Sequence, residues 1–283
     1  MLSFTKLVGT GNDFIFIDLR EKSLTSYSKE HLAQKICDRH FGVGADGIIY
    51  VEQENQKFKW DFYNRDGSQA EFCGNAARCF GSWAKHVLNL DELIFGSRIG
   101  EIKVTSRKVK NENHYVVQLH QLTAVPKAID LKVKEFAAFG AVISQLQNVF
   151  LVNTGVPHFV CHSLKPLSHE KKLKVVGAFR FHPSTGLAGA NVTFLCADET
   201  ETFERGVEDF TLSCGTGVVA AAITLWKIER ATDVLLKTPG GSLRVEILQA
   251  QREEVTKANL IGPAEFICDG KFAISTHTEL EKK

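Results

Sequence analysis

Two Cys-Gly pairs, Cys73-Gly74 and Cys214-Gly215, are the residues of this sequence best suited to acid–base chemistry. Each pair precedes residues with the spacing of a buried helix, so each cysteine is predicted to lie at a helix N-terminus. Backbone N–H groups there lack partners within the helix, and the helix dipole favours an anion. Such a position lowers the pKa of a thiol from its ordinary value of about 8.5. We therefore expect both cysteines to take part in proton transfer.

The glycine after each cysteine allows a ligand to approach the backbone closely. The N–H groups of Gly74 and Asn75 at one helix start, and of Gly215 and Thr216 at the other, can hold a carboxylate. If the two helix starts face each other, one thiol removes the proton from the carbon beside the carboxylate. The other thiol delivers a proton to the opposite face of that carbon. The predicted chemistry is inversion of a stereocentre without a redox change.

An internal repeat places the two Cys-Gly pairs at equivalent positions. Cys73 and Cys214 are separated by 141 residues, and the same separation relates the Gly-turned strands that contain Val104 and Val245. Two further pairs of segments match in the same order, namely Leu7–Phe14 with Leu151–Phe159 and Gly44-Ala45-Asp46 with Gly189-Ala190-Asn191. Four matches in one order indicate a duplication.

Hydrophobic periodicity predicts that each half is rich in strands around one central helix. Strands are predicted at 14–17, 48–51, 102–104, 115–117 and 192–195, and helices at 28–37, 75–88 and 216–228. The last helix is almost wholly apolar, which is typical of a helix wrapped by strands. We therefore expect an α/β (α+β) fold of two pseudo-symmetric domains, 1–121 carrying Cys73 and 122–283 carrying Cys214. The terminal strands are expected to cross into the opposite half.

Composition excludes several other classes of protein. The chain has 283 residues, with 34 Lys and Arg against 33 Asp and Glu, which argues against binding to nucleic acid through a strong basic field. No stretch approaches the roughly 18 apolar residues that cross a bilayer. The first residues lack the pattern of a signal peptide. Seven cysteines without Cys-x-x-Cys spacing argue against a disulfide framework and a structural zinc site. We expect a cytoplasmic protein without a metal site.

Five motifs together resemble diaminopimelate epimerase, and they occur in the order typical of that family. They are Gly9-Thr10-Gly11-Asn12-Asp13-Phe14, Cys73-Gly74-Asn75-Ala76-Ala77-Arg78-Cys79, Thr154-Gly155-Val156-Pro157-His158, Glu204-Arg205-Gly206 and Cys214-Gly215-Thr216-Gly217. The resemblance covers Phe4 to Gly270. It implies a cofactor-independent enzyme that interconverts LL- and meso-diaminopimelate in the synthesis of lysine and peptidoglycan precursors. It also implies two similar domains that close over a small amino-acid substrate.

The resemblance further implies a role for each motif residue. Cys214 would take the proton from the LL isomer and Cys73 would supply the new one, while Glu204 and His158 would tune the thiols. The substrate-binding residues implied are Asn12, Asn64, Gly74, Asn75, Asn191, Glu204, Arg205, Gly215 and Thr216. The planar guanidinium of Arg205 suits the distal carboxylate of the substrate. Purely structural roles stay open for Asn12, in its Gly-rich turn, and for His158.

The chain departs from the usual family pattern at three positions. Val156 stands where the family often has an Asn, and it cannot offer a hydrogen bond to the distal carboxylate. Gly47 stands where a Gln is frequent. Cys268 replaces a Tyr that is associated with dimer contact in the family, which weakens the expectation of a homodimer.

Three alternative functions stay open at the level of sequence. One is a broader racemase of the same mechanism that also acts on a shorter acidic amino acid such as glutamate, as the loss of an amide at Val156 suggests. Another is a non-catalytic amino-acid-binding module with packed cysteines. The third is a thiol redox or metal protein. Relatives of proline racemase are disfavoured, because their usual Cys-Gly-His turn is Cys73-Gly74-Asn75 here.

Overall fold

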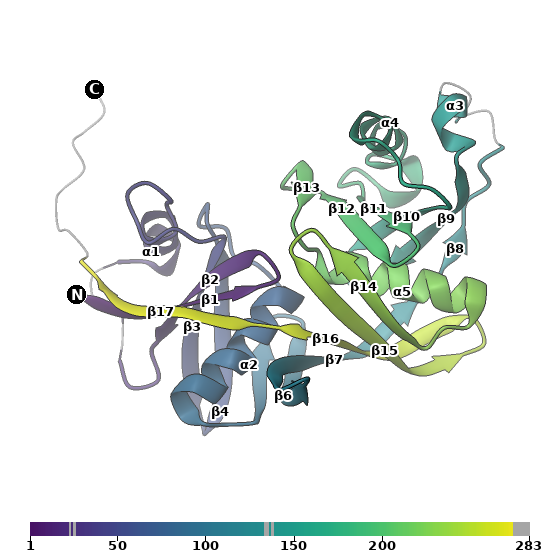
Figure 1. Ribbon diagram of the computed structural model, residues 1–283. Helices are drawn as coiled ribbons and strands as arrows, with labels where there is room; N and C mark the ends of the chain where they lie inside the picture. The colour runs from purple at the N-terminus through teal and green to yellow at the C-terminus, as the bar shows by residue number, and fades with distance from the viewer. Residues whose placement is uncertain (23, 25–26, 133–135, 137–138, 274–283) are drawn as a thin grey trace, which may run out of the picture. The chain divides into compact units, whose positions relative to one another are not determined.

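The structure is a computed structural model that describes residues 1–22, 24, 27–132, 136 and 139–273 (Figure 1). The chain forms two compact units. Unit 1 contains Met1–Lys103 and the segment that begins at Glu265, and unit 2 contains Val104–Ala264. This division differs from the boundary expected after residue 121. The physical reason is that strand β7 (Glu112–Ala124) pairs along its length with β16 (Glu254–Pro263), which holds it in unit 2.

Unit 1 is a sheet wrapped around one long helix. Its elements are β1 (Leu2–Gly9), β2 (Asn12–Asp18), α1 (Lys29–Ile36), β3 (Gly47–Glu54), β4 (Lys57–Asn64), α2 (Gly74–Leu88), β5 (Glu92–Ser97), the start of β6 (Gly100–Val109) and β17 (Glu265–Phe272). Pairing runs in the order β17–β1–β2–β3–β4–β5. The C-terminal strand β17 thus returns to the first strand of the chain, where Cys268 lies opposite Lys6.

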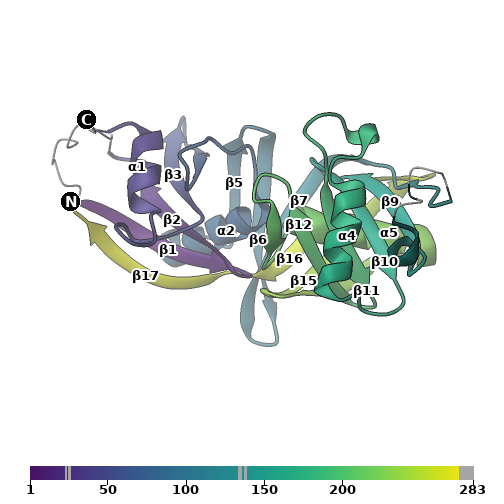
Figure 2. The same cartoon turned by 90° about the horizontal axis from the view of Figure 1, so that it is seen from above.

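Strand β2 shows how the sequence builds two layers on one sheet, because its side chains alternate between the faces. Phe16 packs against Phe80 and Trp83 of α2 on one face. Ile15 and Ile17 point to the other face, where they pack with the apolar side of α1. Figure 2 shows α1 beside these strands. The predicted helix at 28–37 is confirmed, since Ser28 caps α1 by accepting the N–H of His31.

Unit 2 repeats this plan with more strands. Its elements are the rest of β6, β7, β8 (Lys127–Ala128), α3 (Gly140–Ile143), β9 (Leu146–Asn153), β10 (Pro157–Ser163), α4 (His169–Phe179), a 3-10 turn (Pro183–Thr185), β11 (Asn191–Cys196), β12 (Glu199–Glu204), β13 (Asp209–Thr211), α5 (Gly215–Glu229), β14 (Asp233–Thr238), β15 (Gly241–Gln251) and β16. Strands β10 and β11 are parallel, as are β2 and β3 in unit 1.

Helix α5 is the core of unit 2, and strands β9–β12 and β14–β16 contact it. Ten consecutive residues, from Gly217 in its first turn to Trp226, are buried. Helix α4 covers the other face of the sheet, where Val175 and Phe179 pack with Phe159 of β10. The predicted strands and the central helices at 75–88 and 216–228 are confirmed, with both central helices beginning directly after a cysteine. The fold is therefore a strand-rich α+β fold of two domains.

Among the described residues, no helix is both long enough and apolar enough to cross a membrane. The same part of the chain contains no group of three or more His, Cys, Asp and Glu side chains arranged to hold a metal ion.

Candidate active site

Cys73 is the N-cap residue of α2 and has extended backbone angles, with φ −145° and ψ 123°. Its side chain is partly exposed, while Gly74 and Asn75 behind it are buried. Because Cys73 is the N-cap residue, its thiol and the N–H groups of the first turn lie at the same end of α2. This is the arrangement that the Cys-Gly pair predicted, and it can hold an anion beside the sulfur.

Arg78 secures the first turn of α2 from inside the unit. Its side chain is fully buried, and Nη2 donates to Thr10 Oγ1 and to Asn75 Oδ1, each over 2.8 Å. Burial lowers the pKa of Arg78 to about 10, while electrostatic attraction to the thiols of Cys79 and Cys73 acts in the opposite direction. The guanidinium thus remains charged at neutral pH and adds a positive charge to the dipole of the same helix end.

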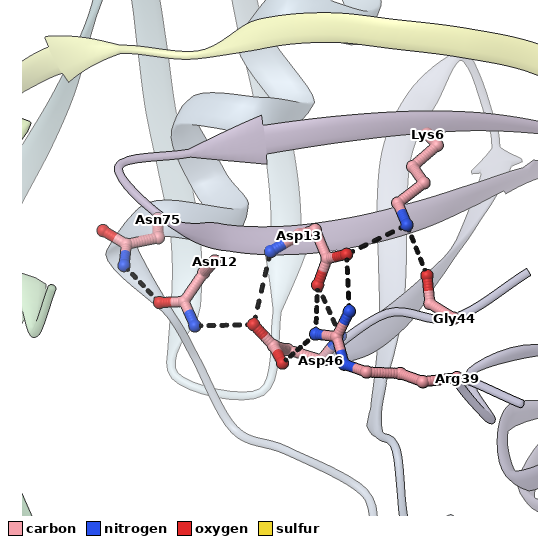
Figure 3. Close-up of polar contacts among 7 residues, drawn as sticks. All are labelled: Lys6, Asn12, Asp13, Arg39, Gly44, Asp46 and Asn75. Atoms are coloured by element: carbon pink, nitrogen blue, oxygen red, sulfur yellow. Dashed lines mark hydrogen bonds and ion pairs between the residues drawn. The ribbon is translucent and has the colours of Figure 1, made fainter. Parts of the chain in front are cut away.

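Asn12 joins this cluster from the start of β2 (Figure 3). Its Oδ1 accepts the amide of Asn75 over 2.5 Å, and its Nδ2 donates to Asp46 Oδ2 over 3.0 Å. Of the predicted residues in unit 1, Cys73, Gly74, Asn75 and Asn12 therefore lie together at one end of α2. The amide of Asn12 does more than serve its own turn, because it connects two other segments of the chain.

Asn64 lies apart from that cluster of hydrogen bonds. It is exposed at the end of β4, opposite Gly47 in β3, and its Nδ2 donates to Ser68 Oγ over 3.0 Å. This contact stabilises the turn that follows β4 and leads toward Cys73.

Cys214 is the N-cap residue of α5 and is the counterpart of Cys73 in unit 2. Its side chain is 7% exposed, and its Sγ lies 3.4 Å from Thr216 Oγ1. Glu204 lies at the end of β12. Its carboxylate accepts hydrogen bonds from the hydroxyl of Thr211 and from Cys214. Burial raises the pKa of the Glu204 carboxyl above its ordinary value, and these two hydrogen bonds act in the opposite direction.

His158 is fully buried, and its hydrogen bonds fix which ring nitrogen carries the proton. The backbone N–H of Arg205 donates to Asn191 Oδ1 over 2.8 Å, so the amide nitrogen of Asn191 faces His158 Nε2 at 3.1 Å. An amide nitrogen only donates, and hence Nε2 is the acceptor. The proton is therefore on Nδ1, which donates to Thr193 Oγ1 over 2.9 Å.

Thr216 links the neutral imidazole to the thiol. Its Oγ1 lies 3.0 Å from His158 Nε2, where it can donate, and 3.4 Å from Cys214 Sγ, in a contact where either atom can be the donor. Burial lowers the pKa of His158 to about 3, and the charge of Arg205 acts in the same direction. At neutral pH the imidazole is uncharged, so it acts as an acceptor that orients Thr216.

The remaining predicted residues of unit 2 lie in this same group. Asn191 is buried beside His158, and Arg205 is half-buried, with its Nη1 donating to the carbonyl oxygen of Gly189 over 3.3 Å. Gly217 is required here because a Cβ at that position would lie 2.5 Å from Thr202 Oγ1 and 3.0 Å from Thr193 Oγ1. The structure thus brings Cys214, Gly215, Thr216, His158, Asn191, Glu204 and Arg205 together within unit 2.

Sequence reasoning missed several residues that complete these groups. In unit 1 they are Thr10, Asp13, Arg39, Asp46 and Arg78, and in unit 2 they are Thr154, Thr193, Thr202 and Thr211. The repeat contained a signal for three of them, since Asp46 is the counterpart of Asn191, and Thr10 and Thr154 match each other. The other threonines carried no comparable signal, because threonines are ordinary in strands.

Known sequences similar to this chain indicate its family. The family model described as diaminopimelate epimerase matches residues 4–122 and 150–267. A diaminopimelate epimerase of Flavobacterium psychrophilum is 34% identical over 272 residues, which cover 93% of this chain and 96% of that protein. One of Aquifex aeolicus is 38% identical over 244 residues, covering 78% and 80% of the two chains.

Solved structures share the fold at low sequence identity. A predicted epimerase of Pseudomonas aeruginosa gives a TM-score of 0.71 at 13% identity, with coverage of 97% of this chain and 100% of that one. A probable proline racemase of Agrobacterium radiobacter gives a TM-score of 0.65 at 12% identity, with coverage of 99% and 95%. The sequence matches are strong enough to assign a family. The chain belongs to the diaminopimelate epimerase family, which is a family of isomerases.

Proposed function

We propose that this protein interconverts LL- and meso-diaminopimelate by two-thiol acid–base catalysis without a cofactor, as a step in the synthesis of lysine and of peptidoglycan precursors. One observation carries the proposal. Each unit places a cysteine at the N-terminus of its central buried helix, followed by a glycine and by first-turn N–H groups that suit a carboxylate. The family membership supports the choice of substrate.

The proposed reaction conserves protons and electrons. The Cys214 thiolate takes the α-proton of the LL isomer, and the resulting negative charge spreads into the α-carboxylate. First-turn N–H groups of α2 and α5 stabilise that charge. The Cys73 thiol then donates its proton to the opposite face of the carbon, which leaves Cys214 as the thiol and Cys73 as the thiolate. The reverse reaction exchanges the two roles.

The polar groups around Cys214 favour the form of the sulfur that each step needs. Thr216 can accept the S–H of the thiol and, after its hydroxyl rotates, donate to the thiolate. While Cys214 is the thiol, neutral His158 accepts the hydroxyl of Thr216, and it does not compete for the substrate proton. Glu204 shares a hydrogen bond with the sulfur and lies next to Arg205, the residue we assign to the distal carboxylate.

Val156 motivates a second candidate activity. It occupies the turn between β9 and β10, where an Asn amide is frequent in the family and where this chain has an apolar side chain. Losing the hydrogen bond from that amide to the distal carboxylate weakens the preference for diaminopimelate over other amino acids by about 1 kcal/mol. A shorter acidic amino acid such as glutamate would then compete better at the same pair of thiols.

The direct test is deuterium uptake at the α-carbon of LL-diaminopimelate in D₂O, measured by mass spectrometry without added cofactor. Wild-type protein should incorporate one deuterium and form the meso isomer. Cys214→Ala and Cys73→Ala should each lose the formation of meso product. Cys268→Ala is the matched control, because Cys268 is a partly exposed cysteine in a strand, and this variant should retain activity.

Three outcomes separate the candidate functions. Uptake from glutamate at enzyme concentrations similar to those for diaminopimelate would favour the broader racemase. Binding of diaminopimelate without any uptake by freshly reduced protein would favour a binding module. Activity that survives in both Cys73→Ala and Cys214→Ala would contradict the two-thiol mechanism.

A further inference from the structure

In unit 1, the amides of Asn75 and Asn12 form a hydrogen-bonded chain with one direction. Arg78 donates to Asn75 Oδ1, Asn75 donates to Asn12 Oδ1, and Asn12 donates to Asp46 Oδ2 (Figure 3 shows the last two). A guanidinium only donates, and an ionised carboxylate only accepts. The two ends therefore determine the orientation of both amides, because turning either one over would oppose donor to donor and acceptor to acceptor.

Arg39 holds the accepting end of this chain. Its Nη2 lies 2.7 Å from Asp46 Oδ1, which leaves Oδ2 directed at Asn12. The same guanidinium binds Asp13 through two hydrogen bonds of 3.1 and 2.8 Å, and Lys6 Nζ lies 3.0 Å from Asp13 Oδ2. The backbone N–H of Asp46 also donates to Asp13 Oδ1 over 3.0 Å. Arg39 thus holds the carboxylate of Asp46, and Asp13 holds its backbone N–H.

The internal repeat gives independent support for a role of Asp46 in the site. Asp46 corresponds to Asn191, and each stands at the start of a strand that runs parallel to its partner, β3 beside β2 and β11 beside β10. In unit 2 this position orients a side chain of the site, since Asn191 fixes the proton of His158. In unit 1 the same position faces the amide of Asn12.

We infer that Asp46, held by Arg39, is a positioning residue of the substrate site that fixes the amide of Asn12 with its nitrogen as the donor. The nitrogen carries a second N–H, which we assign to a carboxylate oxygen of the amino-acid substrate. Arg78 orients Asn75 from the opposite end of the chain. The inference rests on the proposed function, because that function places Asn12 in substrate binding.

Asp46→Asn is the informative variant, and Asp18→Asn is its matched control. Each change removes one carboxylate charge that an arginine holds, but only Asp46 accepts the amide of Asn12. An Asn at 46 can present either end of its amide, so the orientation of Asn12 then depends on Asn75 alone. We expect Asp46→Asn to raise the KM for diaminopimelate about fivefold to tenfold with kcat within about twofold, the effect of one hydrogen bond. Asp18→Asn should change KM by less than about twofold.

The side-chain amide signals of Asn12 in a ¹⁵N–¹H NMR spectrum provide a readout that needs no substrate. They are assigned by their loss in Asn12→Ser. We expect them to shift in Asp46→Asn and to stay near their wild-type positions in Asp18→Asn and Asp46→Glu. If Asp46→Asn does not fold, Arg39→Gln tests the same point, because it releases the carboxylate without removing it.

Equal increases of KM in Asp46→Asn and Asp18→Asn would overturn the inference, since the loss of a carboxylate charge would then explain both. Unchanged Asn12 signals in Asp46→Asn would overturn it as well. If wild-type protein shows no α-proton exchange, the proposed function fails, and the amide signals alone then decide the orientation of Asn12.

Discussion

The hydroxyl of Thr216 lies 3.0 Å from Nε2 of His158, a nitrogen that carries no proton in this structure. Thr216 is also 3.4 Å from the sulfur of Cys214. The contribution of the imidazole to the site is therefore to orient a hydroxyl, and that hydroxyl adjusts to the thiol or the thiolate. A role of His158 as the proton-abstracting base would need a charged ring in a fully buried position.

Replacing Thr216 by Val tests this link between the imidazole and the thiol. Val keeps the shape and the backbone N–H of Thr216 but removes the hydroxyl. We expect kcat to fall about tenfold, since a hydrogen bond to a charged sulfur is worth roughly 1.5 kcal/mol. KM should stay within about twofold. Thr216→Ser, which keeps the hydroxyl, should recover most of the rate in the same deuterium assay, and failure to do so would contradict the role of the hydroxyl.

The low pKa of His158 predicts a pH-dependent loss of stability. Its pKa is about 3 in the folded protein against 6.5 for an ordinary histidine. As the pH falls below 6.5, the unfolded chain takes up a proton that the folded protein refuses, so the folded state loses stability until about pH 3. The loss amounts to about 2 kcal/mol at pH 5.

Urea unfolding at pH 8 and pH 5 measures this effect. His158→Gln should remove about 2 kcal/mol of the difference in unfolding free energy between the two pH values. The exposed His120 provides the control, and His120→Gln should leave the difference as it is in the wild type. An unchanged difference in His158→Gln would show that the buried imidazole is not the group responsible.

The cysteines should differ in reactivity according to burial. Cys73 is partly exposed at a helix N-terminus, whereas burial raises the pKa of Cys79 and Cys161 and raises that of Cys37 to about 12. Iodoacetamide at pH 7 should therefore modify Cys73 and leave these three unmodified until the protein unfolds. Peptide mass spectrometry would report the sites. Diaminopimelate should protect Cys73 but not the partly exposed Cys268, and equal protection of both would argue against substrate binding at Cys73.

Val156→Asn tests whether this turn governs the choice of substrate. The turn is constrained by Gly155, whose φ of 103° favours glycine, so the change alters a side chain on a defined backbone. An amide at 156 should lower the KM for diaminopimelate about fivefold, the effect of one added hydrogen bond. Deuterium uptake from glutamate should not improve. Val156→Leu lacks the amide and should match the wild type, and equal gains for both substrates would contradict a distal contact.

The amino-acid sequence alone determined the local features of this protein. Cys73 and Cys214 could be placed at helix starts because capping and helical periodicity depend on residues close in the chain. The repeat predicted that the two cysteines are equivalent, and in the structure each is the N-cap residue of the central helix of its unit. The motif residues of unit 2 were also predicted as a group, although their contacts were not.

Tertiary structure decided the features that join distant segments. The return of β17 to β1, and the pairing of β7 with β16, set domain limits that no local pattern marks. The proton position on His158 depends on a backbone N–H 47 residues away, at Arg205. The contact of Asp46 with Asn12 likewise depends on two strands meeting in parallel. Hydrogen-bond direction is a property of the assembled neighbours, so it emerges only when the fold has brought donor and acceptor together.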